Sequence, residues 1–143
     1  MAVNPNSFVI AVAGGKGGIG KSVFAANLAI AFSIEMKQPT LLMDLDSQSC
    51  GDQNFLLGIR DVKTVQDLTS FGGSISPQTV SSFLTIHPGS NIGYIAAVKS
   101  REETLNVSPD QFGRQLEALS NVFKFIVVDL GNQIQPLQMT AIE

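Results

Sequence analysis

The sequence predicts an α/β fold in which helices cover both sides of a doubly wound, mainly parallel sheet. Its short apolar runs are continuous rather than alternating, which is typical of strands that are covered on both faces. Helical patterns lie between these runs, as the connections between parallel strands require. With 143 residues, of which 44% are hydrophobic and 15% are charged, the chain is long enough for one domain with an apolar core.

Four apolar runs are expected to form the strands of this sheet. The first run precedes a glycine-rich loop, and the second and the fourth contain aspartates at or near their ends. The pattern does not determine the order of the strands in the sheet. The four runs are residues 8–13, 40–46, 92–98 and 123–130.

Three longer segments and one short one between the runs are expected to be helical, and residues 131–143 are expected to form a loop that opens a further helix. Residues 22–36 are apolar nearly all round, so this helix is expected to be deeply buried. Ser76 is expected to cap a second helix, because a proline follows it at the first helical position. Ser108 and Gln111 have the spacing of a capping box at the start of a third helix. A short helix is expected after Thr64.

Composition and charge argue against several classes of protein. The net charge is -3 and the nine Lys and Arg residues form no basic stripe, so the footprint of a nucleic-acid-binding surface is absent from the sequence. One cysteine, Cys50, excludes an internal disulfide, and the single histidine, His87, has no second ligand at metal-binding spacing. No apolar stretch is long enough to form a transmembrane segment. We therefore expect a cytoplasmic protein.

The glycine-rich loop after the first run matches the phosphate-binding P-loop in full. The pattern is Gly15-x-x-x-x-Gly20-Lys21-Ser22, between a predicted strand and a predicted helix. Glycines let backbone N–H groups converge on phosphate oxygens, and the N-terminus of the following helix adds positive potential. Lys21 is expected to reach the β- and γ-phosphates, and the Ser22 hydroxyl to bind Mg²⁺. The residues expected to bind the nucleotide here are Gly15, Lys16, Gly17, Gly18, Ile19, Gly20, Lys21 and Ser22.

The same glycines also fit a dinucleotide-binding fingerprint, Gly15-x-Gly17-x-x-Gly20. That site requires an acidic residue at the end of the second strand, and either Asp44 or Asp46 could supply it. Lys21 and the serine after it favour a nucleoside triphosphate instead, because a dinucleotide site needs neither a lysine nor a magnesium-binding hydroxyl there.

Three aspartates are candidate functional groups near the phosphates. Asp44 and Asp46 lie two positions apart at the end of the second run, so both side chains are expected to face the ligand crevice of the sheet. Asp129 lies near the end of the fourth run, where P-loop proteins place a carboxylate that contacts Mg²⁺. The alternative is structural, with an aspartate that caps the following turn or is simply solvated.

The loop KGGIGKS resembles the deviant Walker A loop of the MinD/ParA class of P-loop ATPases. That class has a second lysine near the start of the loop, and Lys16 occupies this place. The segments AANLA and LLMDLDSQ also resemble this class. The stretch DLDSQSCGDQNFLLGI is most similar to the CpaE/TadZ branch, in which a pair of aspartates precedes a Gly-Asp, here Gly51 and Asp52, and a short apolar helix.

This resemblance implies a sheet of P-loop NTPase type and an ATPase that acts as a dimerisation switch with ATP and Mg²⁺. Two ATP-bound subunits would face each other, and Lys16 of one would touch the phosphates of the other, as an arginine finger does. Lys16, Lys21 and Asp46 would be catalytic, with Asp46 orienting the attacking water. The residues expected to bind Mg²⁺ or support its ligand shell are Ser22, Asp44 and Asp129.

The residues after the fourth run, DLGN, depart from this class, in which a proline-containing switch is usual. Gly131 can still present its N–H to a γ-phosphate. The departure favours an alternative function, a localisation scaffold that binds nucleotide and hydrolyses little or none of it.

The cellular role implied by the resemblance is positional. The protein would place a pilus or secretion assembly at a site such as a cell pole, bound to protein partners and, through one of them, peripherally at the membrane. Partitioning of chromosomes or plasmids and placement of the division site are alternatives. Because the sequence stops in a predicted helix after its fourth strand, residues 1–143 are expected to be the N-terminal part of a single P-loop ATPase domain.

Overall fold

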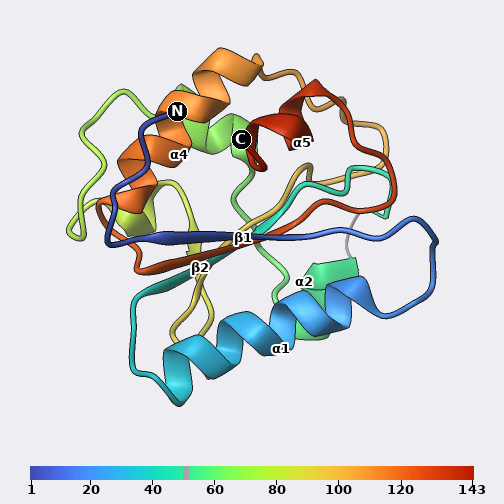
Figure 1. The fold of residues 1–143 in the computed structure, drawn as a ribbon, viewed down its shortest axis with the longest axis horizontal. Coiled ribbons are helices and arrows are strands. Elements are labelled where there is room, and N and C mark those ends of the chain that lie inside the picture. Colours follow the sequence, from blue (N-terminus) through green and yellow to red (C-terminus); the bar gives the residue numbers. More distant parts are fainter. Residues whose placement is uncertain (50–51) are drawn as a thin grey trace.

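The computed structural model describes residues 1–49 and 52–143, so Cys50 and Gly51 lie outside the described residues. The fold alternates strands and helices along the chain, as the continuous apolar runs predict (Figure 1). The elements are β1 (Phe8–Val12), α1 (Lys21–Ile34), β2 (Thr40–Asp44), α2 (Asp52–Leu57), α3 (Val65–Ser70), the 3-10 turn η1 (Val80–Ser82), β3 (Thr85–Ile86), β4 (Gly93–Ile95), α4 (Pro109–Ser120), β5 (Phe125–Asp129) and α5 (Pro136–Thr140).

The sheet has the strand order β1-β5-β2-β4-β3. Its first four members in that order are mutually parallel, and only the two-residue β3 runs antiparallel to its neighbour. The α/β fold class with a mainly parallel sheet is therefore confirmed. β5 lies between β1 and β2 and is parallel to both. The carboxyl end of β5 therefore lies beside the loop after β1, although more than a hundred residues separate the two strands in the sequence.

Helices cover the sheet on both faces (Figure 1). α1 and α2 lie on one face, over a cluster that includes Leu42, Tyr94 and Val127. The helices α3, α4 and α5 lie on the other face, over a larger cluster in which Phe112 and Leu116 of α4 are joined by residues of the sheet such as Ile126. This coverage explains why every residue of β2 and β5 is buried and why those strands read as unbroken apolar runs.

The prediction that the first helix is deeply buried is wrong for half of its circumference. Ala25, Ala26 and Ala29 pack closely on the sheet, whereas Phe24 is 59% exposed and Val23 is also exposed. A helix on one face of a sheet buries only the stripe that it turns toward the strands. Nothing in the described part of the chain covers the opposite stripe.

Two further expectations about local structure need correction. The segment after Ser76 forms a turn and only the short η1, whose N-cap is Thr79, because the Thr79 hydroxyl bonds back to the carbonyls of Ser74 and Ser76. The fifth strand, β3, was not expected, since two residues leave no readable pattern. The helix after Thr64 is confirmed with a full capping box, and Ser108 caps α4 by accepting the Gln111 N–H.

The described helices are all shorter or more polar than a bilayer crossing requires, so none of them could span a membrane.

Candidate phosphate and cation site

The glycine-rich loop joins the carboxyl end of β1 to the first turn of α1. Gly18 and Gly20 have φ angles of 74° and 88°, a left-handed conformation that side chains other than glycine rarely adopt. Gly20 is the N-cap of α1 and makes no side-chain cap, so the first N–H groups of this helix remain available to a ligand. The backbone therefore has the shape that a phosphate cradle requires.

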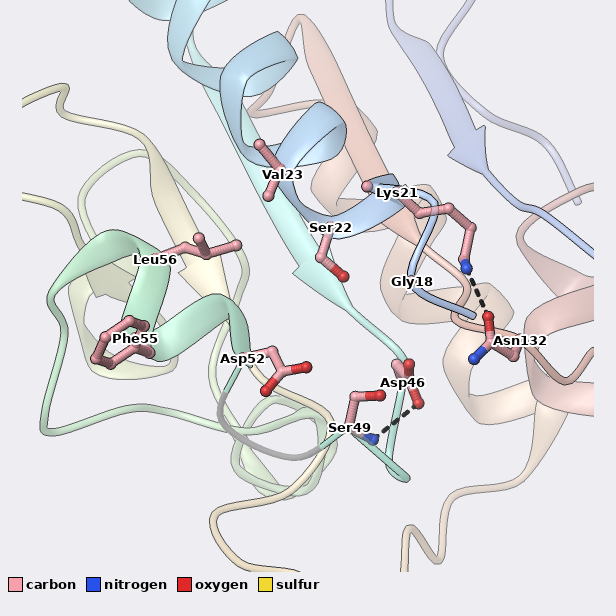
Figure 2. Close-up of a pocket in the computed structure, with 11 residues that line it drawn as sticks. Gly18, Lys21, Ser22, Val23, Asp46, Ser49, Asp52, Phe55, Leu56 and Asn132 are labelled. Carbon is pink, nitrogen blue, oxygen red and sulfur yellow. Dashed lines mark hydrogen bonds between the residues drawn. The ribbon is translucent and has the colours of Figure 1, made fainter. Parts of the chain in front are cut away.

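Lys21 is held at this loop by two carbonyl oxygens, of which Figure 2 shows the one from Asn132. Its Nζ donates to the backbone oxygen of Lys16 at 2.9 Å and to the side-chain oxygen of Asn132 at 2.5 Å. Asn132 follows β5, and its amide also lies against Gly17, where an added Cβ would approach it to 3.2 Å. The lysine that is expected to bind phosphate is thus bonded to the segment after β5.

Ser22, Asp129 and Gln53 form a hydrogen-bonded cluster below the loop. The Ser22 hydroxyl donates to Asp129 Oδ2 at 2.6 Å. The side-chain nitrogen of Gln53 donates to the same carboxylate oxygen at 3.0 Å and to the Ser22 backbone oxygen at 2.9 Å. Asp129 and Gln53 are both fully buried. The sequence predicts Ser22 and Asp129 as residues of the cation site, whereas it does not predict Gln53.

Asp44 and Asp46 do not share one environment, contrary to the expectation that both face the crevice. Asp44 is buried beside Asp129, its partner in the register of β2 and β5. Burial raises the pKa of Asp44 well above its ordinary value; the backbone N–H of Asp46 opposes this, and nearby carboxylates, including Asp129, add to it. Asp46 lies beyond the strand end and lines the cavity described below.

Asp46 also has a structural role, which the sequence left open as an alternative. Its carboxylate accepts hydrogen bonds from the N–H groups of Gln48 and Ser49 and so caps the following turn. The same side chain lies against Gly131, which has a φ of 71°. A Cβ at residue 131 would come within 2.5 Å of the Asp46 carboxyl carbon. The glycine is therefore required by both its backbone angle and this close approach.

A cavity of about 390 Å³ opens beside these groups (Figure 2). Phe55, which is 87% exposed, and Leu56 of α2 form one of its walls, and the P-loop forms another. The lining residues are Gly18, Gly20, Lys21, Ser22, Val23, Asp46, Ser49, Asp52, Phe55, Leu56 and Asn132.

Lys16 differs from Lys21 in its surroundings. It is exposed, and it does not belong to the cavity lining. Gly15, Gly17 and Ile19 are exposed parts of the same loop. His87 lies far along the chain in the turn between β3 and β4, where its Nδ1 pairs with the Ser90 hydroxyl at 2.8 Å. That contact is one expected of a structural histidine.

The residues present fit a magnesium ion that is shared with a nucleotide. No group of three His, Cys, Asp or Glu side chains that could hold a metal occurs in residues 1–49 and 52–143. Mg²⁺ usually keeps several waters and takes one or two carboxylates together with substrate phosphates, so it does not need such a cage. The Ser22 hydroxyl and the Asp129 carboxylate supply the donors of this kind of site.

The chain matches the CobQ/CobB/MinD/ParA nucleotide binding domain over residues 10–140. It is 30% identical to the antiactivator FleN of Pseudomonas aeruginosa over 114 residues, which are 80% of this chain and 38% of that protein. Two solved structures share the fold. A ParA family ATPase from Chlorobium tepidum TLS has a TM-score of 0.79 and 23% identity over 95% of this chain and 56% of its own.

The second structure is the septum site-determining protein MinD from Pyrococcus horikoshii OT3, complexed with Mg-ADP. Its TM-score is 0.73 at 24% identity, over 94% of this chain and 53% of its own. The chain therefore spans about half the length of these two structures and 38% of the length of FleN.

Proposed function

This chain belongs to the CobQ/CobB/MinD/ParA nucleotide binding domain family, and from that premise we propose that it binds ATP with Mg²⁺ and acts as an ATP-driven dimerisation switch. The observation that carries this proposal is the convergence of Lys21, Ser22 and Asp129 at the N-terminus of α1. A cation for phosphate oxygens, a hydroxyl and a carboxylate for Mg²⁺, and free helix N–H groups are the parts that a nucleoside triphosphate needs.

Each residue has a specific task in this proposal. Lys21 exchanges the oxygens of Lys16 and Asn132 for phosphate oxygens and neutralises charge there. Ser22 and Asp129 hold the cation, which when bound shields the phosphate oxygens and polarises them. Asp46, which lines the cavity, orients the attacking water, and Asp44 supports the cation from its buried position. The Gly131 N–H, which donates to Asp129 Oδ1 in this structure, would exchange that partner for the γ-phosphate.

Lys16 is proposed to complete the site of a second copy. Its exposed position outside the cavity of its own chain leaves the ammonium free to reach across an interface. Positive charge supplied in trans stabilises the charge that develops on the phosphate during hydrolysis. ATP would then hold the homodimer together and hydrolysis would release it.

The cellular role that we propose is the positioning of a pilus or secretion assembly, in the cytoplasm and at a cell pole. It rests on the likeness of residues 44–59 to the CpaE/TadZ branch. FleN is named as an antiactivator, and the two solved neighbours are named as a ParA family ATPase and a septum site-determining protein. Partitioning and division-site placement are therefore the alternative roles within one family.

A nucleotide-binding scaffold with little hydrolysis is the second candidate, and one observation favours it. Asn132, from the unusual DLGN segment, bonds directly to Lys21 and so competes with phosphate for the lysine. Such competition weakens nucleotide binding and turnover without removing any part of the P-loop.

Phosphate release and sedimentation separate the two candidates. We expect the purified protein to release phosphate from ATP, and Lys16→Ala and Asp46→Ala to slow this release strongly. Turnover in the wild type that is no faster than in both variants would overturn the hydrolytic switch and support the scaffold. In sedimentation, a dimer that forms with an ATP analogue in the wild type but not in Lys16→Ala would support the action in trans. A dimer fraction that ATP does not change would contradict it.

A further inference from the structure

Gln53 is the buried polar residue of the site to which the proposed function gives no task. It lies in the first turn of α2, a helix of only six residues, and its side chain has no exposed surface. Burying a glutamine is costly unless its amide is fully hydrogen-bonded. The contacts of this side chain therefore indicate what it does.

The nitrogen of the Gln53 amide joins three separate elements. It donates to the Ser22 backbone oxygen of α1 and to the Asp129 carboxylate of β5, while the residue itself belongs to α2. Both partners are acceptors, so the nitrogen end of the amide must face them. The same Asp129 oxygen also accepts the Ser22 hydroxyl, so Gln53 fixes the carboxylate in the orientation that meets the serine.

The oxygen of the Gln53 amide is left without a donor. It is buried and has no hydrogen-bond partner within the described part of the chain. An unsatisfied buried acceptor destabilises the folded state, which a protein rarely tolerates unless a ligand or water satisfies the group. The oxygen shares its carbon atom with the nitrogen that donates to Asp129, so it lies next to the cluster of Ser22 and Asp129.

We propose that Gln53 is a positioning residue of the cation site, whose nitrogen holds Asp129 toward Ser22 and whose free oxygen accepts a hydrogen bond from a water bound to Mg²⁺. The inference rests on the proposed binding of a magnesium nucleotide. Partners of this kind, one step removed from the metal, typically change metal affinity 10–100-fold when they are removed. Gln53 is thus assigned to the affinity for the cation and not to contact with the nucleotide.

The test measures ADP binding by calorimetry at a series of Mg²⁺ concentrations and in EDTA. Gln53→Met keeps the length of the side chain and removes both polar atoms. We expect its Mg²⁺ half-saturation to rise about 10-fold or more, with the affinity for ADP in EDTA unchanged. Affinities that fall by the same factor with and without Mg²⁺, or an unchanged half-saturation, would overturn the inference.

A second variant is isosteric, so it remains informative if Gln53→Met does not fold. Gln53→Glu keeps the shape of the side chain but replaces the donating nitrogen by an oxygen, so it no longer holds the Asp129 carboxylate. We expect the increase in melting temperature on adding Mg²⁺ and ADP to be smaller in both variants than in the wild type. If Gln53 had only a structural role, each variant would lower the melting temperature by the same amount with and without Mg²⁺ and ADP.

Gln138→Met is the matched control. Gln138 is also a buried glutamine, but its amide nitrogen donates to the Leu45 backbone oxygen and not to Ser22 or the Asp129 carboxylate. It should lower the melting temperature and leave the Mg²⁺ half-saturation unchanged. Wild-type protein that binds no ADP in either condition would refute the proposed function itself. A wild type that binds with Mg²⁺ dependence equal to that of Gln53→Met would refute only the role of Gln53.

Discussion

The two faces of the sheet use their apolar residues in different ways. Beneath α4, aromatic and aliphatic side chains such as Phe112 and Leu116 are fully buried in a closed cluster. Beneath α1, the contact is made by small alanines together with Phe32, which stacks on Phe125 of β5. Large apolar side chains such as Phe24 of α1 and Phe55 of α2 remain exposed. The α4 face therefore supplies stability, while the α1 face carries the phosphate loop and leaves apolar surface beside it.

The largest effect expected from this comparison is on folding. Phe112→Ala should lower the free energy of unfolding by about 3–5 kcal/mol, because it leaves a cavity in a closed core. Phe24→Ala, the matched change on the exposed stripe of α1, should change it by no more than about 0.5 kcal/mol. Urea denaturation measures both. Equal losses in the two variants would show that the faces do not differ.

The next effect is on ligand binding and concerns only the α1 face. Lys21→Ala should weaken ADP binding about 10- to 100-fold, since it removes a charge-assisted hydrogen bond to phosphate. The change should hardly alter the urea midpoint, because Lys21 is only partly buried and its partners are carbonyl oxygens at the surface. Calorimetric titration provides the affinity. Undiminished binding would remove the phosphate site from this face.

A smaller effect of the opposite sign is expected at Asn132. Because its oxygen competes for Lys21, Asn132→Ala should strengthen ADP binding by about 2- to 10-fold, the range of one ordinary hydrogen bond. Gln133→Ala is the control, since Gln133 bonds to Gln48 and not to the lysine. Weaker binding in Asn132→Ala would mean that the amide contacts the nucleotide directly.

The smallest effect lies in the pH dependence of stability and follows from Asp44. Its pKa is raised in the folded protein by burial, so the folded state holds its proton to higher pH than the unfolded state does. The stability of the nucleotide-free protein should therefore fall as the pH rises from the ordinary aspartate value through the raised one. Asp44→Asn should flatten this decline and be more stable than the wild type at neutral pH. The measurement is the free energy of unfolding as a function of pH. Curves that run parallel for the wild type and Asp44→Asn would contradict the raised pKa of Asp44.

The sequence was sufficient to predict four strands of the sheet, although not their order. The central strands β2 and β5 are the clearest cases, because they are covered on both faces and read as continuous apolar runs. The sequence also indicated Ser22 and Asp129, since each lies in a recognisable local pattern. The burial of α1 could not be predicted, because composition alone does not say which side of an apolar helix meets the sheet. The prediction that Ser76 caps a helix was wrong, because the Thr79 hydroxyl donates to the carbonyls of Ser74 and Ser76 and so favours a turn.

Two contacts of the site that the sequence does not reveal, those of Gln53 and Asn132, join residues far apart in the chain. Gln53 meets a carboxylate that is 76 residues away, and Asn132 meets a lysine that is 111 residues away. Neither lies in a motif whose spacing reveals the contact. Only the strand order, with β5 between β1 and β2, brings these segments together.

The register that places Asp44 opposite Asp129 has a consequence for the lifetime of the protein. Two buried carboxylates at neighbouring strand ends make the empty protein less stable than it would be with a cation between its carboxylates and a phosphate. A ligand that binds only the folded state raises the free energy of unfolding with its concentration. Molecules that carry magnesium nucleotide should therefore resist proteolysis longer than empty ones, and cellular abundance would follow the supply of nucleotide.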